Sequence, residues 1–494
     1  MISIKPYEFW FVTGSQHLYG EDALREVEKH SIHITQGLNQ GDRLPYKLVF
    51  KSVLTTSDAI RALCREANSD ENCAGLMTWM HTFSPAKMWI AGLSELQKPI
   101  LHLHTQFNRD IPWDDIDMDF MNLNQSAHGD REYGFIHTRM QLSRKVIVGY
   151  WQDEAVKSRL SAWMQTAVGH NEGKGLKVAR FGDNMRHVAV TEGDKVEAQI
   201  KLGWTVDYFG IGDLVERIQS ISAEAANALC REYEALYDFP ESASKEGAIR
   251  ESIKEQAKIE LALRAFLEEG GYTAFTTNFE DLHGMKQLPG LAVQRLMAEG
   301  YGFGGEGDWK TAALTRIMKM IANNQKTSFM EDYTYHLEPG NEMILGSHML
   351  EVCPTVASTK PRIVVHPLSM GNKADPARLV FDGVEGKGVN VSLIDMGNRF
   401  RLIVNEVEAV KSSKETPHLP VAKVLWKPQP SLREATEAWI YAGGAHHTVF
   451  SGQVSIEQLC DWADMVKVEC VVIDRTTQVR QLRKELQWSE AAWK

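Results

Sequence analysis

Residues 57–80, SDAIRALCREANSDENCAGLMTWM, contain an amphipathic segment followed closely by an apolar run. Polar and apolar residues alternate with helical spacing in SDAIRALCREAN (57–68), whereas CAGLMTWM (73–80) is apolar almost throughout. A strand that is apolar on both faces is typical of a parallel sheet, because the crossover helices cover both sides of such a sheet. This stretch therefore predicts an α/β fold for the chain around it.

The same alternation extends through the first third of the chain. A second amphipathic segment, EDALREVEKHSIHITQGL (21–38), lies between the first two expected strands. The other buried strands expected here are Phe9–Gly14, Tyr46–Phe50, Pro99–Phe107 and Lys145–Trp151. We interpret the polar, glycine-rich GHNEGKG (169–175) as a linker that ends an N-terminal α/β domain, residues 1–175. Ligands of such sheets bind at the loops beyond the carboxyl ends of the strands.

The remaining two thirds of the chain divide into two further parts. Strands expected at Leu176–Gly182, Thr205–Gly212 and Tyr272–Phe279, with long helices between them, predict a second doubly wound α/β domain at residues 176–326. From residue 327 to 494, short strands are separated by turns rich in Gly and Asn, such as EPGN (338–341). This pattern predicts a mainly antiparallel β, barrel-like C-terminal domain.

Composition and charge exclude several classes of function. The chain has 494 residues, 43% hydrophobic and 24% charged, as in ordinary soluble proteins. Its net charge of −11 and its lack of a basic tract argue against a nucleic-acid partner. No apolar run reaches the roughly 20 residues that cross a bilayer, and the first residues lack signal-peptide features. We therefore expect a cytoplasmic protein with no membrane partner.

Known nucleotide and thiol motifs are missing as well. The sequence has no Walker A loop, no G-x-S-x-G elbow and no G-x-G-x-x-G after a strand. Its six cysteines are scattered without C-x-x-C spacing, which disfavours a disulfide framework and a thiolate zinc site. Candidate chemistry must therefore come from carboxylates and imidazoles.

The stretch YGFGGEGDWKTAALTRIMK (301–319) sets two acids among glycines ahead of an amphipathic helix. Asp308 is placed to accept hydrogen bonds from the first turn of that helix as its N-cap. Glu306 precedes the cap, so its carboxylate is either solvated or a ligand, and local sequence leaves both interpretations open. Glycine allows positive φ and close backbone approach, which a ligand site in this loop would need.

Three later segments carry acids and histidines with ordinary structural explanations. In SFMEDYTYH (328–336), a strand would place Glu331 and Tyr333 on one face, as any half-exposed strand could. In GSHMLEVCP (346–354), His348 shares a strand face with aliphatic residues, which is typical of a hydrogen-bonded core histidine. In GGAHHTVF (443–450), a strand would bring one of His446 and His447 to a given site, whereas a loop could bring both.

Two carboxylates and two imidazoles from these segments, Glu306, Glu331, His348 and His447, would make a mixed oxygen and nitrogen ligand set. Such a set suits Mn²⁺ or a similar divalent ion that keeps open positions for substrate oxygens. The four residues are far apart in sequence, so no short ligand spacing identifies them.

The chain resembles the L-arabinose isomerase family from near the N-terminus to the last helix. Ordered blocks carry the resemblance, among them FVTGSQHLYG, WMHTFSPAKMWI, RFGDNMRHVAVTEGDKV, FEDLHGMKQLPGLAVQRLM, GEGDWKTAAL, TSFMEDYTYH, GSHMLEVCP and GGAHHTVF. The family is similar in fold to L-fucose isomerases, with two α/β domains followed by a mainly β domain. This agrees with the three-part pattern above.

The resemblance implies a site and a cofactor. It implies that Glu306, Glu331, His348 and His447 bind one Mn²⁺ per subunit, with Co²⁺ or Mg²⁺ as substitutes, and that Glu306 and Glu331 are also the catalytic acid/base pair. The sugar-binding residues that it implies are Gln16, Leu18, Phe83, Gln125, Met185, Phe279, Tyr333 and His446. It further implies a homohexamer or homotetramer with active sites between subunits.

The implied activity is conversion of L-arabinose to L-ribulose, the first step of L-arabinose catabolism, with conversion of D-galactose to D-tagatose as a side activity. Two alternatives stay open. One is an isomerase for another aldose such as L-fucose, and the other is a non-catalytic sugar-binding protein on the same scaffold. A binding protein needs no carboxylate pair around a metal, so Glu306 together with Glu331 discriminates between the classes.

Overall fold

The computed structural model describes residues 2–243, 247–368 and 373–493. The chain forms two compact units, one spanning Ile4–Asn171 and the other spanning Glu172–Lys494 together with the residues before Ile4. Among the described residues, no helix combines the length and the apolar character that a membrane span requires.

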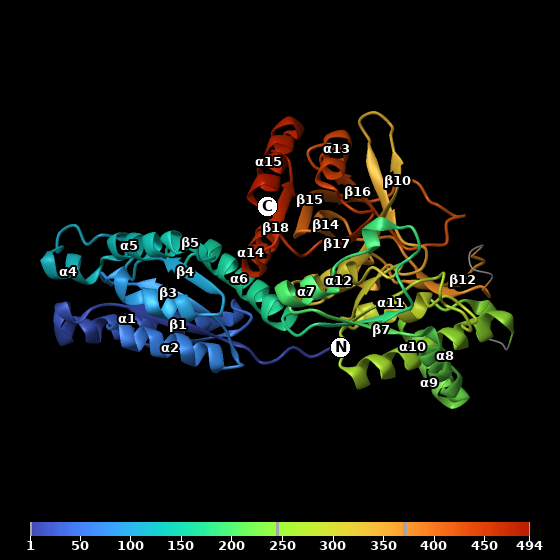
Figure 1. The fold of residues 1–494 in the computed structure, drawn as a ribbon, viewed down its shortest axis with the longest axis horizontal. Helices are drawn as coiled ribbons and strands as arrows, with labels where there is room; N and C mark the ends of the chain where they lie inside the picture. Colours follow the sequence, from blue (N-terminus) through green and yellow to red (C-terminus); the bar gives the residue numbers. More distant parts are fainter. Residues whose placement is uncertain (1, 244–246, 369–372, 494) are drawn as a thin grey trace. The chain divides into compact units, whose positions relative to one another are not determined.

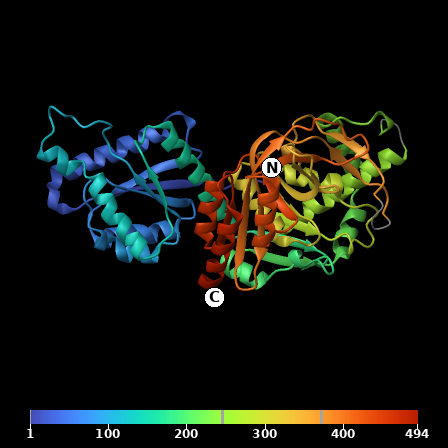
Figure 2. The ribbon, with the colours of Figure 1, turned by 90° about the horizontal axis from the view of Figure 1, so that it is seen from above.

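The N-terminal unit is built on a five-stranded parallel sheet with the strand order β2-β1-β3-β4-β5. Its strands are β1 (Glu8–Gly14), β2 (Lys47–Leu54), β3 (Cys73–Met80), β4 (Ile100–His104) and β5 (Lys145–Val148). Helices flank both faces of the sheet (Figures 1 and 2); they are α1 (Gly20–Asn39), α2 (Ser57–Ser69), α3 (Ile90–Glu95), α4 (Met118–Leu123), α5 (Ser126–Arg139) and α6 (Glu154–Gly173). Successive strands are added in one direction from β1 to β2 and in the opposite direction from β3 onward, so the strand order reverses between β1 and β3. Ligands bind at such a reversal, beyond the carboxyl ends of the strands.

Residues 57–80 fold as their pattern predicts. Thr56 caps α2 by accepting the amide hydrogen of Ala59, and the buried face of the helix carries Ile60, Leu63, Cys64 and Ala67. Every residue of β3 is buried, because helices cover both of its faces.

The linker expected at residues 169–175 is wrong, because α6 continues through Gly173. Ala167, Val168 and His170 are buried, so this end of the helix lies in the protein interior. Asn171 donates from Nδ2 to the carbonyls of Ala167 at 2.8 Å and Ala74 at 2.7 Å. Burial and these bonds offset the low helix propensity of the glycines, about 1 kcal/mol each.

The second unit begins with a four-stranded parallel sheet in the order β7-β6-β8-β9. Its strands are β6 (Lys177–Phe181), β7 (Thr205–Phe209), β8 (Ala274–Thr277) and β9 (Gly302–Gly304). The helices of this region are α7 (Lys195–Leu202), α8 (Ile211–Ser220), α9 (Ala223–Leu236), α10 (Ala248–Gly270), α11 (Gly290–Ala298) and α12 (Trp309–Ile321). All of α12 is buried, because it lies between this sheet and the β-structure that follows.

That β-structure is a closed antiparallel barrel joined by one parallel strand, which confirms the barrel-like prediction. The ring runs β14-β17-β10-β11-β16-β15, and β15 pairs back with β14. The strands are β10 (Thr327–His336), β11 (Met343–Ser347), β14 (Gly386–Asp395), β15 (Phe400–Val410), β16 (Lys423–Pro428) and β17 (His447–Ser451), with β18 (Glu469–Ile473) parallel to β15. A separate hairpin, β12 (Arg362–Val365) and β13 (Ala377–Val380), and helices α13 (Leu432–Ala442), α14 (Ile456–Val466) and α15 (Val479–Ala492) complete the unit.

Candidate functional site

The glycine-rich loop after β9 holds Glu306 in an unusual conformation. Glu306 has a φ of 61°, a left-handed value that few residues other than glycine adopt. A side chain on Gly305 would place its Cβ 3.1 Å from Nε2 of His348, and one on Gly307 would meet Cα of Asn184 at 2.6 Å. The glycines therefore let the loop approach both neighbours, and they leave Glu306 as the one side chain that projects from it.

Asp308 is the N-cap of α12, as predicted, and it does more than cap the helix. Its carboxylate accepts the amide hydrogen of Thr311 at 3.1 Å and the hydroxyl of the same residue at 2.7 Å. It also lies 3.3 Å from Nζ of Lys310 and 3.1 Å from Nδ1 of His447. Burial opposes ionisation of Asp308, but Lys310 and His447 outweigh it and hold the pKa of the carboxyl well below its usual range.

Strand register brings Glu331 beside the histidines. In the barrel β10 lies between β11 and β17, and Glu331 is paired with Ser347 on one side and with His447 on the other. Residues directly opposite across antiparallel strands have neighbouring side chains. Two strand pairs therefore bring Glu331 next to His447 and next to Ser347, the neighbour of His348, although these residues are far apart in the sequence.

His348 does not lie in a strand, so the prediction that it shares a strand face with Leu350 is wrong. β11 ends at Ser347, and the chain turns at once. Glu351 stabilises this turn, because its Oε2 accepts from Nδ1 of His348 at 2.5 Å and from the amide of Leu350 at 3.0 Å. The side-chain bonds compete with strand pairing and stop the strand.

Glu306, Glu331, His348 and His447 converge with gaps between their polar atoms. Nε2 of His447 lies 3.7 Å from Oε2 of Glu306, and Nε2 of His348 lies 3.9 Å from Oε2 of Glu331. Both distances are too long for hydrogen bonds, and the buried Nε2 of His447 has no hydrogen-bond partner among the described residues. Donor atoms about 2.1 Å from a six-coordinate ion lie about 3 Å apart when adjacent and about 4 Å apart when opposite. Within each pair, the two atoms are therefore spaced as two ligands of one divalent ion could be.

His446 joins the same cluster from the start of β17. Its Nε2 lies 3.9 Å from Oε2 of Glu306, and together Glu306, His446 and His447 can place ligand atoms within 4.8 Å of one another. Both consecutive histidines thus reach one acid, which the sequence allowed only for a loop. His446 lies just before the strand, and this position frees its side chain from strict alternation.

The charges of the cluster shift its ionisation toward carboxylate and imidazolium. Burial raises the pKa of Glu306, but the neighbouring imidazoles of His446, His447 and His348 outweigh this effect, and the pKa is lowered overall. For His348 burial acts against the proton, yet Glu351 and the other acids raise its pKa to about 9. Glu306 is therefore a carboxylate at neutral pH, ready to accept a proton or bind a cation.

A cavity of about 170 Å³ opens beside these groups. Glu306, Glu331 and His348 line it, together with Phe279 and Tyr333 among the predicted sugar-binding residues. Glu331 and Tyr333 both face it, as strand alternation predicts. Met185 approaches the same loop, because its amide donates to the carbonyl of Glu306 at 3.0 Å. An arrangement of acids, imidazoles and aromatic walls can bind a small polyol and move protons on it.

The other four predicted sugar-binding residues lie together in the N-terminal unit. Gln16 and Leu18 follow β1, Phe83 follows β3, and Gln125 immediately precedes α5. Their loops are joined by bonds between the Ser15 and Thr82 hydroxyls at 2.7 Å, and from Nε2 of Gln125 to the Tyr19 hydroxyl at 3.1 Å. This is the carboxyl edge of the sheet at the β1/β3 reversal, and the Leu18 side chain is exposed there.

Known families match the chain along most of its length. The models of the L-arabinose isomerase N-terminal, central and C-terminal domains match residues 3–175, 177–324 and 326–469. The chain belongs to the L-arabinose isomerase family. A relative named L-arabinose isomerase from Geobacillus stearothermophilus is 68% identical over 494 residues, which is 100% of both chains. One of the same name from Bacillus subtilis (strain 168) is 63% identical over 494 residues, 100% of this chain and 99% of the relative.

Within this member of the L-arabinose isomerase family, sequence reasoning missed the two acids behind the imidazoles. Glu351 follows His348 by three residues, a spacing at which side chains meet in a turn but not in the strand that was expected. Asp308 was recognised only as a helix cap, because nothing in the sequence indicates its contact with His447, which lies 139 positions away.

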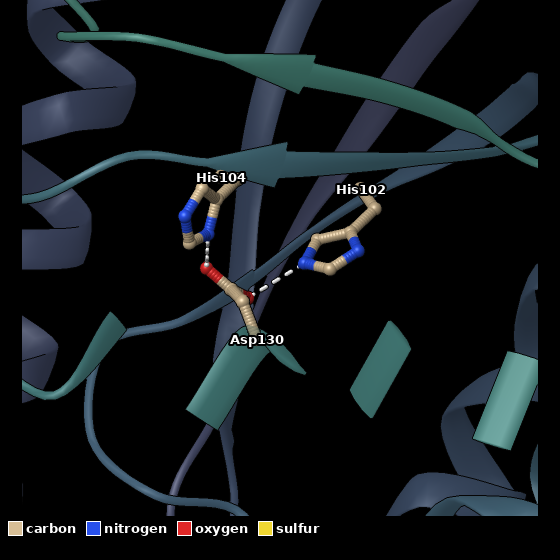
Figure 3. Close-up of side chains that lie close together, drawn as sticks. All are labelled: His102, His104 and Asp130. Carbon is tan, nitrogen blue, oxygen red and sulfur yellow. Dashed lines mark hydrogen bonds and ion pairs between the residues drawn. The ribbon is translucent and has the colours of Figure 1, made fainter. Parts of the chain in front are cut away.

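A second histidine–carboxylate cluster in this family member was missed altogether. His102 and His104 project from one face of β4, and Asp130 from α5 lies between them (Figure 3). The carboxylate is 2.7 Å from Nε2 of His102 and 2.7 Å from Nδ1 of His104, and it accepts the amide hydrogen of Met80 at 3.2 Å. The alternating His-Leu-His at 102–104 was the available signal.

Proposed function

We propose that this protein is a metal-dependent aldose–ketose isomerase that converts L-arabinose to L-ribulose, the first step of L-arabinose catabolism. Membership of the L-arabinose isomerase family supports the reaction class and the substrate. One observation carries the proposal: Glu306 approaches Nε2 of His447 and Glu331 approaches Nε2 of His348. Both carboxylates line the same cavity.

The proposed cofactor is one Mn²⁺ per subunit, held by Glu306, Glu331, His348 and His447, with Co²⁺ or Mg²⁺ as substitutes. Mixed oxygen and imidazole donors suit Mn²⁺ and related divalent ions. When bound, such an ion polarises the sugar carbonyl and stabilises the negative charge that develops on its oxygen. The buried Nε2 of His447, which has no hydrogen-bond partner among the described residues, supports the assignment, because a bound cation would satisfy it.

The carboxylates carry the acid–base chemistry. Isomerisation moves hydrogen between C1 and C2 of the sugar and a proton between O1 and O2. Glu306, ionised beside its imidazoles, accepts a proton from the substrate, and Glu331 across the cavity exchanges a proton at the neighbouring position. No net charge or electron leaves the substrate, so two groups that can each gain and lose one proton suffice.

We propose eight sugar-binding residues, four in each compact unit. Met185, Phe279, Tyr333 and His446 belong to the unit with the acids, and Gln16, Leu18, Phe83 and Gln125 belong to the N-terminal unit. Glutamine amides both donate to and accept from sugar hydroxyls. We further propose a cytoplasmic homohexamer or homotetramer whose active sites form between subunits.

Other sugars and one other class of function define the alternatives. A single methylene or hydroxyl difference changes binding in an apolar pocket by about 1–3 kcal/mol, so we propose conversion of D-galactose to D-tagatose as a side activity. An isomerase specific for another aldose such as L-fucose would keep the same acids. A non-catalytic sugar-binding protein would have no need for paired carboxylates facing imidazoles.

Ketose formation by the full-length protein tests these proposals. The protein is freed of metal with a chelator, reloaded with Mn²⁺ and incubated separately with L-arabinose, D-galactose and L-fucose. We expect ketose chiefly from L-arabinose, and only after metal is returned. Ketose mainly from another aldose would support the first alternative. Sugar binding without ketose formation in the folded, metal-loaded protein would overturn the enzyme proposal.

A further inference from the structure

Each imidazole of the metal-binding set has a buried carboxylate on its far side. Oε2 of Glu351 lies 2.5 Å from Nδ1 of His348, and Oδ2 of Asp308 lies 3.1 Å from Nδ1 of His447. Glu351 and Asp308 are 7% and 1% exposed, so neither contact is a transient ion pair on the protein surface. His447 begins β17 and His348 follows the end of β11, yet the arrangement behind the two rings is the same.

The surroundings of Asp308 leave it able only to accept hydrogen bonds. Nζ of Lys310, itself buried, lies 3.3 Å from Oδ1, and Thr311 donates to both oxygens through its amide and its hydroxyl. A carboxylate held by a buried ammonium and two donors stays ionised, so its remaining contact, Nδ1 of His447, must bring a hydrogen.

Glu351 is held as an acceptor by the turn that follows β11. The oxygen that faces His348 also accepts the amide hydrogen of Leu350 at 3.0 Å. Because an amide can only donate, Oε2 of Glu351 is the acceptor in that bond. With the carboxyl ionised, the short contact with His348 also has the imidazole as the donor.

A hydrogen on Nδ1 determines what the opposite nitrogen can do. In the neutral form, which is the form that ligates a metal, the imidazole carries one hydrogen, so a hydrogen on Nδ1 leaves the lone pair of Nε2 for the ion. Nε2 of His348 and Nε2 of His447 are the atoms that face Glu331 and Glu306. Phe329 packs against both rings, with centroids 4.8 Å and 5.2 Å away, which restricts their rotation.

We propose that Glu351 and Asp308 are positioning residues for the metal centre. Each fixes the tautomer and the ring orientation of one histidine, so that both present Nε2 to the divalent ion. The inference rests on the proposed function, because the divalent ion is part of that proposal. Neither residue is needed to touch substrate or metal, and their effect passes through His348 and His447.

The two positioning residues differ in what else they support. Lys310, the partner of Asp308, donates to the carbonyls of Val190, Thr191 and Glu192 at 3.0, 3.0 and 2.6 Å. Replacing Asp308 therefore leaves a buried ammonium without its counter-ion and also removes a helix cap. The Glu351 contacts lie within one turn, so Glu351 is the cleaner position for a test.

The experiment measures Mn²⁺ affinity without sugar, by calorimetry on the full-length protein after metal removal. We expect Glu351→Ala to weaken Mn²⁺ binding by about 10–100-fold. Glu351→Gln, which keeps a side-chain oxygen that can accept from Nδ1, should recover part of that loss. Glu342→Gln, which changes an exposed acid beside β11, is the matched control and should bind as the unaltered protein does.

A second readout separates positioning from simple support of the fold. The visible spectrum of the Co²⁺-loaded protein reports the ligand field, so it should change in Glu351→Ala and be partly restored in Glu351→Gln. Unchanged Mn²⁺ affinity and an unchanged Co²⁺ spectrum in Glu351→Ala, with metal binding intact in the unaltered protein, would overturn the inference alone. Absence of Mn²⁺ binding by the unaltered protein would instead overturn the proposed function.

Asp308→Asn provides an independent check on the second histidine. We expect it to weaken Mn²⁺ binding in the same direction, because an asparagine oxygen accepts from Nδ1 less strongly than a carboxylate. Normal affinity in a folded Asp308→Asn variant would remove Asp308 from the proposal. If that variant does not fold, the Glu351 variants decide the question.

Discussion

The described part of the chain contains two clusters that combine the same residue types, histidine and carboxylate, but place the carboxylates differently. In the N-terminal unit Asp130 lies between His102 and His104, 2.7 Å from each (Figure 3). In the second unit Glu306 and Glu331 stop 3.7 and 3.9 Å short of the imidazoles, and other acids bind the far nitrogens. Residue type alone therefore does not distinguish the proposed metal site from the N-terminal cluster; the position of the carboxylate relative to the two ring nitrogens does.

In the N-terminal cluster of His102, His104 and Asp130, here called the closed cluster, the carboxylate has all its partners within the protein. Both oxygens of Asp130 are occupied by imidazole nitrogens, and one also accepts the amide of Met80, so β3, β4 and α5 are joined at one point. A metal on Nε2 of His102 would put the ring hydrogen on Nδ1, which is buried with no hydrogen-bond partner among the described residues. Leaving that donor unpaired costs about 1–3 kcal/mol, so the cluster favours its own hydrogen bonds over an ion.

The largest expected difference between the clusters is in turnover. Glu306→Gln should fold normally and lose at least about 10²-fold in kcat, because the amide cannot exchange the proton. Ketose formation under saturating L-arabinose and Mn²⁺ measures the loss, with Glu224→Gln on the exposed face of α9 as the control. Near-full activity in Glu306→Gln would remove its acid/base role.

Metal affinity should separate the clusters next. His348→Ala or His447→Ala removes one imidazole donor, and we expect Mn²⁺ affinity to fall by at least about 100-fold, beyond what loss of an outer partner costs. His104→Ala, in the closed cluster, should leave the affinity unchanged. Calorimetry of the three variants measures the Mn²⁺ affinity of each. Equal losses of affinity in all three would contradict the proposed difference between the clusters.

For the stability of the fold, in contrast to metal affinity, we expect the closed cluster to be the one that matters. Asp130→Asn removes a buried charge that accepts from two imidazoles, and we expect the free energy of unfolding to drop by about 1–3 kcal/mol. Denaturant unfolding of the full-length, metal-free protein measures the change. Mn²⁺ affinity, measured on the same variant, should not move. A metal-binding loss in Asp130→Asn would mean that the closed cluster also serves an ion.

The smallest expected effect is on pH dependence. Burial lowers the pKa of His81 and of His137 in the N-terminal unit to about 3. Below pH 6.5 the unfolded chain binds protons that the folded chain does not, so each histidine's contribution is present above pH 6.5 and lost as pH falls toward 3. Between pH 7 and pH 6 the loss is about 0.7 kcal/mol for each histidine.

The second unit should respond to pH with the opposite sign at His348. Its pKa, raised to about 9 by Glu351 despite burial, makes its contribution present below pH 6.5 and lost as pH rises through 9 in the metal-free protein. Hydrogen exchange at pH 6 and pH 7, corrected for the intrinsic rate, should therefore show protection lost first in segments around His81 and His137. Equal loss in both units would contradict the comparison.

Much of the fold could be predicted because it depends on local patterns. The apolar run at 73–80 is a fully buried strand, and Asp308 caps α12 as its place before the helix indicates. Predictions failed where distant contacts override local preference. Glycines at 169 and 173 indicated a linker, but burial keeps them in α6, and the Glu351 side chain ends a strand that the alternation at His348 predicted to continue.

The candidate site followed from residue types only in part. The sequence and its family resemblance nominate Glu306, Glu331, His348 and His447, and their roles as ligands stay predictions. The barrel register that pairs Glu331 with both Ser347 and His447 has no local signal. The acids behind the imidazoles lack one as well, because a helix cap and a turn acid look the same in sequence whether or not a histidine meets them.

By itself, the sequence determined the alternation of helices and strands, the turns of the barrel and the supply of acids and imidazoles, because these depend on neighbours within a few residues. Tertiary structure alone decided which acid meets which ring nitrogen. Hydrogen-bond direction and the distance from carboxylate to imidazole, 2.7 Å in one cluster against 3.7 and 3.9 Å in the other, separate a closed His–Asp–His bridge from an open set of ring nitrogens. Those quantities are set by strand pairing between segments more than 100 residues apart, such as β10 and β17.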